Sequence, residues 1–192
     1  MRITIFCASS PSIDEKYFIA AKELATILVS AKHSIIYGGG DTGLMGAIAD
    51  TVLEMGGKIT GVIPGFMKEV EWMHKGVEDM IVVDSMAERK KLLIEKSDAI
   101  VVLAGGTGTL EELMEVVSLK KLGKYPNPIV ILNSYGFYDL LQDFMVKMVD
   151  EKFMNPKHLD VWEMVNSPSE VLESIKNQER WGEDVINFAS VK

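Results

Sequence analysis

The stretch that decides the fold is VVLAGGTGTLEE, residues 101–112. It opens with an apolar, β-prone run that lacks polar alternation, which is typical of a strand buried on both faces. Three glycines follow, Gly105, Gly106 and Gly108, and then a segment that begins a helix. A buried strand, a glycine turn and a helix in this order predict a parallel α/β unit whose turn can bring backbone N–H groups against a phosphate.

A second copy of this unit is YGGGDTGLMG, residues 37–46. Gly38, Gly40 and Gly43 satisfy the G-x-G-x-x-G spacing of a nucleotide-binding turn. The dinucleotide version also needs an acidic residue about 20 positions further on to hold the ribose. The next apolar run ends in VIPG, residues 62–65, without an acid, so an NAD-dependent oxidoreductase is disfavoured. A turn that only lets helix and sheet pack closely is the alternative for this site.

Apolar runs and amphipathic segments alternate along the whole chain. The expected strands are 3–6, 34–37, 59–63, 80–83, 99–103, 129–132 and 161–165, and the expected helices are 13–30, 43–55, 87–96, 109–121, 137–149 and one starting at Ser167-Pro168. The alternation predicts an α/β fold: one Rossmann-like, doubly wound domain with a mainly parallel sheet of about six or seven strands and helices on both faces. We expect a nucleotide-binding catalytic domain over residues 1–177 and a C-terminal tail over 178–192.

The net charge and the cysteine content indicate which kinds of partner and which compartment to expect. The 192-residue chain carries a net charge of −8, which disfavours nucleic acid polymers and anionic membranes as partners. No apolar stretch approaches the roughly 20 residues of a membrane span, and the N-terminal apolar run is too short for a signal peptide. The single cysteine, Cys7, follows a strand-like run and is expected to be a buried thiol rather than a nucleophile. We therefore expect a cytoplasmic protein.

The turn at 105–109 predicts a monophosphate site. Its glycines expose N–H groups, and the hydroxyls of Thr107 and Thr109 add donors. No lysine follows as in a triphosphate-binding P-loop. A structural alternative exists, because Thr109 with Glu112 three residues later fits a helix capping box. Both glycine turns follow strands, so they should face one cleft, with Ala8-Ser9-Ser10 as a third wall.

Four charged residues are candidates for chemistry. Arg89 and Lys90 lie in the first turns of a helix, where cations are disfavoured unless an anion is bound, although a solvated charge run is the ordinary alternative. Glu111 and Glu112 differ by about 100° on a helix, so only one can face the cleft. A carboxylate beside a ribose-phosphate site suits glycosidic cleavage, because it can stabilise a ribosyl cation and deprotonate water. The three histidines show no metal-site spacing.

These motifs together resemble the LOG (LONELY GUY) family of cytokinin-activating phosphoribohydrolases. The match rests on GGGDTGLMG at 38–46, MAERK at 86–90 and GGTGTLEE at 105–112, with FCASS at 6–10 and LNSYGFY at 132–138 in support. The resemblance implies hydrolysis of the N-glycosidic bond of an N6-substituted adenosine 5'-monophosphate or AMP, without a metal or organic cofactor. The family has also been labelled lysine decarboxylase, but no pyridoxal-phosphate lysine context is present in this sequence.

The resemblance also implies roles for particular residues. Arg89 and Glu112 take the catalytic positions. The implied substrate and phosphate contacts are Ser9, Gly39, Gly40, Gly43, Glu71, Lys90, Gly105, Gly106, Thr107, Gly108, Thr109, Glu111 and Ser118. A homodimer is implied, with the helix that follows the second glycine turn near the interface.

The chain departs from the family pattern near the base pocket. Ala104 replaces the proline of the signature, and the stretch 116–123 lacks the Trp and Gln of plant members. These changes bear on base specificity rather than on phosphate binding. A second function remains open: a non-catalytic carrier of a nucleotide or phosphorylated cofactor on the same fold. Retention of both Arg89 and Glu112 favours the hydrolase, because a carrier has no need of that carboxylate.

Overall fold

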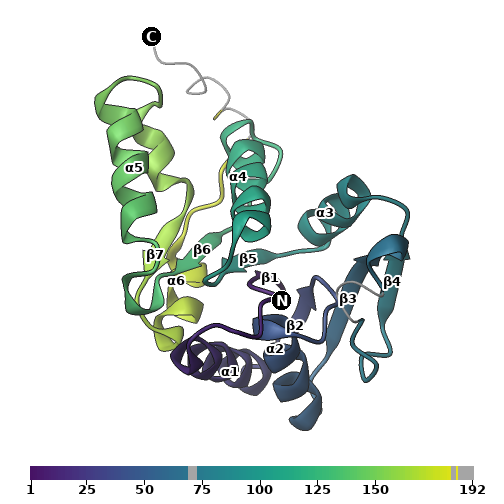
Figure 1. Cartoon of the computed structure of the whole chain (residues 1–192). Helices are drawn as coiled ribbons and strands as arrows, with labels where there is room; N and C mark the ends of the chain where they lie inside the picture. Colours follow the sequence, from purple (N-terminus) through teal and green to yellow (C-terminus); the bar gives the residue numbers. More distant parts are fainter. Residues whose placement is uncertain (69–72, 183–184, 186–192) are drawn as a thin grey trace.

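A computed structural model describes residues 1–68, 73–182 and 185 of the chain (Figure 1). Its centre is one seven-stranded sheet in the order β4-β3-β2-β1-β5-β6-β7, and every neighbouring pair runs parallel. The strands are β1 (Arg2–Phe6), β2 (Ser34–Tyr37), β3 (Ile59–Pro64), β4 (Met80–Val83), β5 (Ala99–Val102), β6 (Ile129–Leu132) and β7 (Glu163–Val165). The predicted doubly wound α/β fold is confirmed.

The chain reverses its direction of winding between β1 and β5. Strands β2 to β4 add to one side of β1, and β5 to β7 add to the other. The two central strands pair in register from Ile3 with Ala99 to Phe6 with Val102, so they end at the same level. A crevice opens at such a reversal, outside the carboxyl ends of the strands, and it is the usual ligand site of this fold.

Helices cover both faces of the sheet (Figure 1). One face carries α1 (Glu15–Ser30), α2 (Gly43–Glu54) and α6 (Val171–Asn177), and the other carries α3 (Met86–Glu95), α4 (Thr107–Lys121) and α5 (Asp139–Asp150). In β5, Ala99 and Val101 join the core of the first face, while Ile100 and Val102 join that of the second. Apolar side chains on both sides explain why this run shows no polar alternation.

Some element boundaries differ from the sequence prediction. The last strand begins at Glu163 rather than at residue 161, because a 3₁₀ segment, Pro156–Val161, occupies the preceding residues. The predicted start at Ser167-Pro168 is confirmed: the side chains of Ser167 and Glu170 form a capping box. That box starts a 3₁₀ turn, Pro168–Glu170, which leads directly into α6.

The start of the tail docks on the body. The side-chain amide of Gln178 exchanges two hydrogen bonds with the backbone of Ile129 in β6, at 3.2 and 3.1 Å. The backbone N–H of Trp181 donates to the Pro126 carbonyl at 3.1 Å. Among the described residues, no helix is both long and apolar enough to cross a membrane.

Candidate active site

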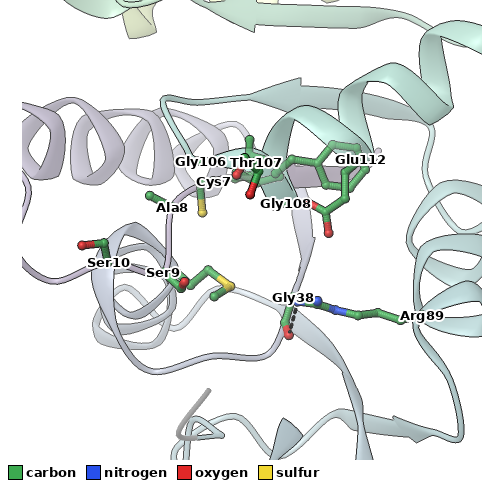
Figure 2. Close-up of a pocket in the computed structure, with 14 residues that line it drawn as sticks. Cys7, Ala8, Ser9, Ser10, Gly38, Arg89, Gly106, Thr107, Gly108 and Glu112 are labelled. Atoms are coloured by element: carbon green, nitrogen blue, oxygen red, sulfur yellow. Dashed lines mark hydrogen bonds between the residues drawn. The ribbon is translucent and has the colours of Figure 1, made fainter. Parts of the chain in front are cut away.

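A cavity of about 280 Å³ lies at the reversal point of the sheet (Figure 2). Its walls come from four parts of the chain that are distant in sequence: residues 5–10, Gly38 with Met45, Arg89, and the start of α4 with residues 106–109 and Glu112. The predicted cleft, with the segment 8–10 as its third wall, is therefore where the fold places it. Because β1, β2 and β5 all end here, the sheet itself brings these segments together.

The second glycine turn forms the start of α4. Gly106 is the N-cap, with φ −86° and ψ −158°, and the helix begins at Thr107. The alternative that Thr109 caps this helix with Glu112 is wrong, because the N-cap lies three residues earlier, at Gly106. Thr109 lies within the first turn and is buried against Gly105, where a Cβ would approach its Oγ1 to 2.1 Å.

Gly106 and Gly108 face open space. A Cβ added at either position would meet no atom within 4 Å, so neither glycine is required by contacts among the described residues. Both line the cavity beside the exposed Thr107. Backbone N–H groups at a helix start, left uncovered by side chains, form a site suited to phosphate.

The first glycine turn has a different local role. Gly38 lines the cavity, whereas Gly39, Gly40 and Gly43 do not. Gly43 has φ +62°, and a Cβ there would lie 2.5 Å from the carbonyl carbon of Ser9. Its neighbour Leu44 donates a 2.9 Å hydrogen bond to the Ala8 carbonyl. This turn therefore packs the start of α2 against the loop after β1, and that loop forms the cavity wall.

Arg89 is buried and anchored, with only 5% of its surface exposed. Its Nη2 donates to the carbonyl of Gly38 at 3.0 Å, and its Nε donates to the carbonyl of Val62 at 3.2 Å. The interpretation of this segment as a solvated charge run is therefore wrong for Arg89. Two carbonyls, one from the residue after β2 and one from within β3, hold the guanidinium at the cavity wall.

Glu112 approaches from the opposite side. Figure 2 shows it reaching in from α4 while Arg89 reaches in from α3, with both charged ends directed at the cavity. Cys7, the residue after β1, also lines the cavity and is 8% exposed, as predicted for a buried thiol. Burial raises the pKa of Cys7, the charge of Glu112 raises it further, and Arg89 lowers it. A thiol with a raised pKa is a poor nucleophile, which disfavours Cys7 as a reacting group.

The remaining predicted contacts lie in other places. Ser9 lines the cavity with Thr107 and Thr109. Lys90 and Glu111 do not line it but form an ion pair with each other. Ser118 is exposed, and its hydroxyl donates to the Met114 carbonyl at 2.8 Å. The prediction for Glu71 falls outside the described residues.

Sequence reasoning missed Met45 as a wall residue. Its sulfur faces Gly38, since a Cβ on that glycine would approach it to 2.9 Å. The signal for it in the sequence was its position in the first turn of a helix that follows a glycine turn. Within the described part of the chain, no group of three or more His, Cys, Asp or Glu residues could hold a metal ion.

The geometry suits a small phosphorylated molecule. One end offers glycine N–H groups and threonine hydroxyls, and the other offers a cation and a carboxylate from two separate helices. A carboxylate in this position can deprotonate water or stabilise a developing positive charge. An anchored guanidinium can hold an anion or donate hydrogen bonds to a heterocycle.

Comparisons with known proteins show which family the chain belongs to. The family described as "Possible lysine decarboxylase" matches residues 45–175. The cytokinin riboside 5'-monophosphate phosphoribohydrolase LOG5 of Arabidopsis thaliana is 35% identical over 96% of this chain and 81% of its own length. LOG1 of the same plant, with the same enzyme name, is 40% identical over 88% of this chain and 78% of its own length.

Solved structures share the fold at lower identity. The molybdenum cofactor binding protein of Rippkaea orientalis has a TM-score of 0.70 at 19% identity, covering 91% of this chain and 94% of its own. The molybdenum cofactor carrier protein of Chlamydomonas reinhardtii has a TM-score of 0.68 at 18% identity, covering 92% and 96%. Sequence identity over most of the relatives' length, rather than this shared fold, decides the assignment: the chain belongs to the LOG family.

Proposed function

We propose that this protein hydrolyses the N-glycosidic bond of an adenosine 5'-monophosphate, with or without an N6 substituent, to free base and ribose 5-phosphate. The observation that carries the proposal is that Arg89 and Glu112, on different helices, face one cavity whose floor is the open glycine turn of α4. The relatives LOG5 and LOG1, named as phosphoribohydrolases of this substrate class, support it. Among the described residues no lysine lines the cavity, which gives no support to lysine decarboxylation.

In this proposal the 5'-phosphate binds at the start of α4. The N–H groups of Gly106 to Thr109 and the positive end of the helix dipole complement a dianion. The hydroxyls of Thr107 and Ser9, which line the same cavity, supply further donors. Gly39, Gly43 and Gly105 pack closely against their neighbours and in this proposal act by shaping the walls, while Gly40 remains a proposed phosphate contact on the family pattern.

Glu112 and Arg89 serve the reacting bond. The bond between the ribose C1' and the base nitrogen breaks, and its electron pair leaves with the base. Glu112 stabilises the cationic ribose and accepts a proton from the water that attacks C1'; that proton then passes to the departing base nitrogen, so the base leaves neutral. Arg89 faces the developing negative charge on the base or the phosphate. Lys90, Glu111, Ser118 and Glu71 remain proposed nucleotide contacts on the family pattern.

A homodimer is part of the proposal. The helix α5, next to α4 in Figure 1, exposes 83% of Leu140 and 55% of Phe144. Exposed large apolar side chains on one helix are typical of a surface that another subunit covers. Sedimentation of the wild type and of Leu140→Glu would test it, and a wild-type monomer would refute it. We further propose a cytoplasmic location and a catalytic domain that ends near residue 177.

The first experiment is an incubation of purified protein with AMP and with N6-isopentenyladenosine 5'-monophosphate. Chromatography follows free base and ribose 5-phosphate. We expect release from at least one nucleotide, with the rate ratio defining the base preference. Tight nucleotide binding without release would refute the hydrolase and favour the carrier function that the sequence left open.

A further inference from the structure

Two helices carry the opposed catalytic groups, and one lysine connects these helices. Arg89 lies on α3 and Glu112 on α4, which stand apart on the same face of the sheet (Figure 1). Lys90, the neighbour of Arg89, forms ion pairs with Glu111 and Glu115 of α4. Its Nζ lies 2.8 Å from Glu115 Oε2.

The two carboxylates are not equivalent partners. The side chain of Glu111 is 55% exposed, whereas that of Glu115 is 35% exposed and its Oε2 is shielded from solvent. The Lys90 side chain is only 16% exposed. Water screens an exposed ion pair strongly and a shielded one much less. Glu115 is therefore the partner of Lys90 whose ion pair solvent screens less.

The position of this pair gives it a role at the site. Lys90 follows Arg89 directly, and Glu115 lies three residues after Glu112, on the neighbouring turn of α4. A shift of α3 against α4 changes the separation of the guanidinium and the carboxylate across the cavity. Displacements of about 1 Å at such a site can reduce turnover about a hundredfold.

We propose that Glu115 is a positioning residue, which acts through Lys90 to hold α3 against α4 so that Arg89 and Glu112 keep their separation. Glu115 is not among the residues that line the cavity. The expected change in kcat rests on the proposed function, but the contact between α3 and α4 through Lys90 and Glu115 does not depend on the substrate.

The kinetic test is a double-mutant cycle of Glu115→Gln and Lys90→Gln with AMP as substrate. We expect Glu115→Gln to lower kcat about tenfold while KM changes less than about twofold, because the phosphate site lies within α4. In the Lys90→Gln background the same change should alter kcat less than about twofold. An unchanged kcat, or an equal loss in both backgrounds, would overturn the proposal. If Glu115→Gln does not fold, Glu115→Asp takes its place.

The matched control is Glu95→Gln, which removes the carboxylate of an ion pair within α3. Its partner Lys91 lies 3.9 Å away, and both side chains are at least 60% exposed. This variant should leave kcat and KM unchanged.

A structural readout separates this proposal from the proposed function. Amide hydrogen exchange of α3 should quicken in Glu115→Gln but not in Glu95→Gln. Unchanged exchange in Glu115→Gln would show that Glu115 does not hold α3 against α4. Wild-type protein that releases no base would refute the hydrolase, and the exchange experiment would still decide the role of Glu115.

Discussion

The Nη2 atom of Arg89 donates a 3.0 Å hydrogen bond to the carbonyl oxygen of Gly38, which joins the start of α3 to the end of β2. The same contact explains why position 38 is a glycine. A Cβ at position 38 would lie 2.3 Å from Nη2, so any other residue there would overlap the guanidinium. The first glycine turn therefore serves the site by leaving room for the arginine.

We expect Gly38→Ala to impair turnover more than stability. The overlapping atoms are the ends of the flexible side chains Arg89 and Met45, so the fold can adjust while the guanidinium leaves its anchor. The kcat for AMP should fall at least about tenfold, with a melting temperature close to that of the wild type. Gly65→Ala, where a Cβ would meet its nearest atom at 3.8 Å, is the control. Wild-type kcat in Gly38→Ala would contradict the anchoring role.

Glu112→Gln tests the carboxylate directly. The amide keeps the size of the side chain but neither accepts a proton nor carries the charge that stabilises a ribosyl cation. We expect nucleotide affinity, measured by calorimetry, to stay within a few-fold of the wild type. The kcat should fall on the order of a hundredfold or more. An active Glu112→Gln variant would remove Glu112 from its proposed role.

Gly108→Ala should separate stability from function. Position 108 lies in the first turn of α4 with open space around it, so alanine should stabilise the helix by up to about 1 kcal/mol. The new methyl group would enter the proposed phosphate site and raise KM for AMP several-fold. Adenosine, which lacks the phosphate, should react equally poorly with both proteins. Urea unfolding and steady-state kinetics measure the two effects.

Another helical glycine provides the contrast. At Gly46 in α2 a Cβ would lie 2.1 Å from the Asp41 carbonyl oxygen, so Gly46→Ala should destabilise the protein. A stability loss in Gly108→Ala, or an unchanged KM, would mean that the glycine is structural rather than a phosphate contact.

The sequence was a good guide wherever a local pattern decides the structure. Apolar runs such as 99–103 are buried on both faces, so their composition identified the strands and the sheet type. The start of α4 was misplaced because a Thr-x-x-Glu pattern favours a cap at Thr109, whereas the extended conformation of Gly106 turns the chain earlier. A glycine N-cap has no side chain to mark it.

The sequence could predict which residues belong to the site but not the contacts that hold them in place. Motifs identified Arg89 and Glu112, yet the anchoring of Arg89 by Gly38 and Val62 depends on how α3 packs over the ends of β2 and β3. Nor could spacing reveal that Lys90 reaches across to Glu115. Such contacts join residues about 25 to 50 positions apart, and only the assembled sheet brings them together.

Lys120 makes the stability of the protein depend on pH. Its side chain is fully buried on α4, and its Nζ lies 5.9 Å from the ring centre of Trp181 without a hydrogen-bond partner among the described residues. Burial lowers the pKa of Lys120 to about 8, from 10.5. Below about pH 8 the amine is charged in both folded and unfolded protein, so the full cost of burying the charge is present.

Between about pH 8 and 10.5 the unfolded state binds more protons at Lys120, so this residue makes stability rise with pH. We expect Lys120→Met, which keeps an unbranched side chain, to stabilise the protein near neutral pH by about 2 kcal/mol and to remove this rise. Urea unfolding at about pH 7 and about pH 10 measures both effects, with the exposed Lys124→Met as control. A destabilised Lys120→Met would instead show that the contact with Trp181 outweighs the cost of burial.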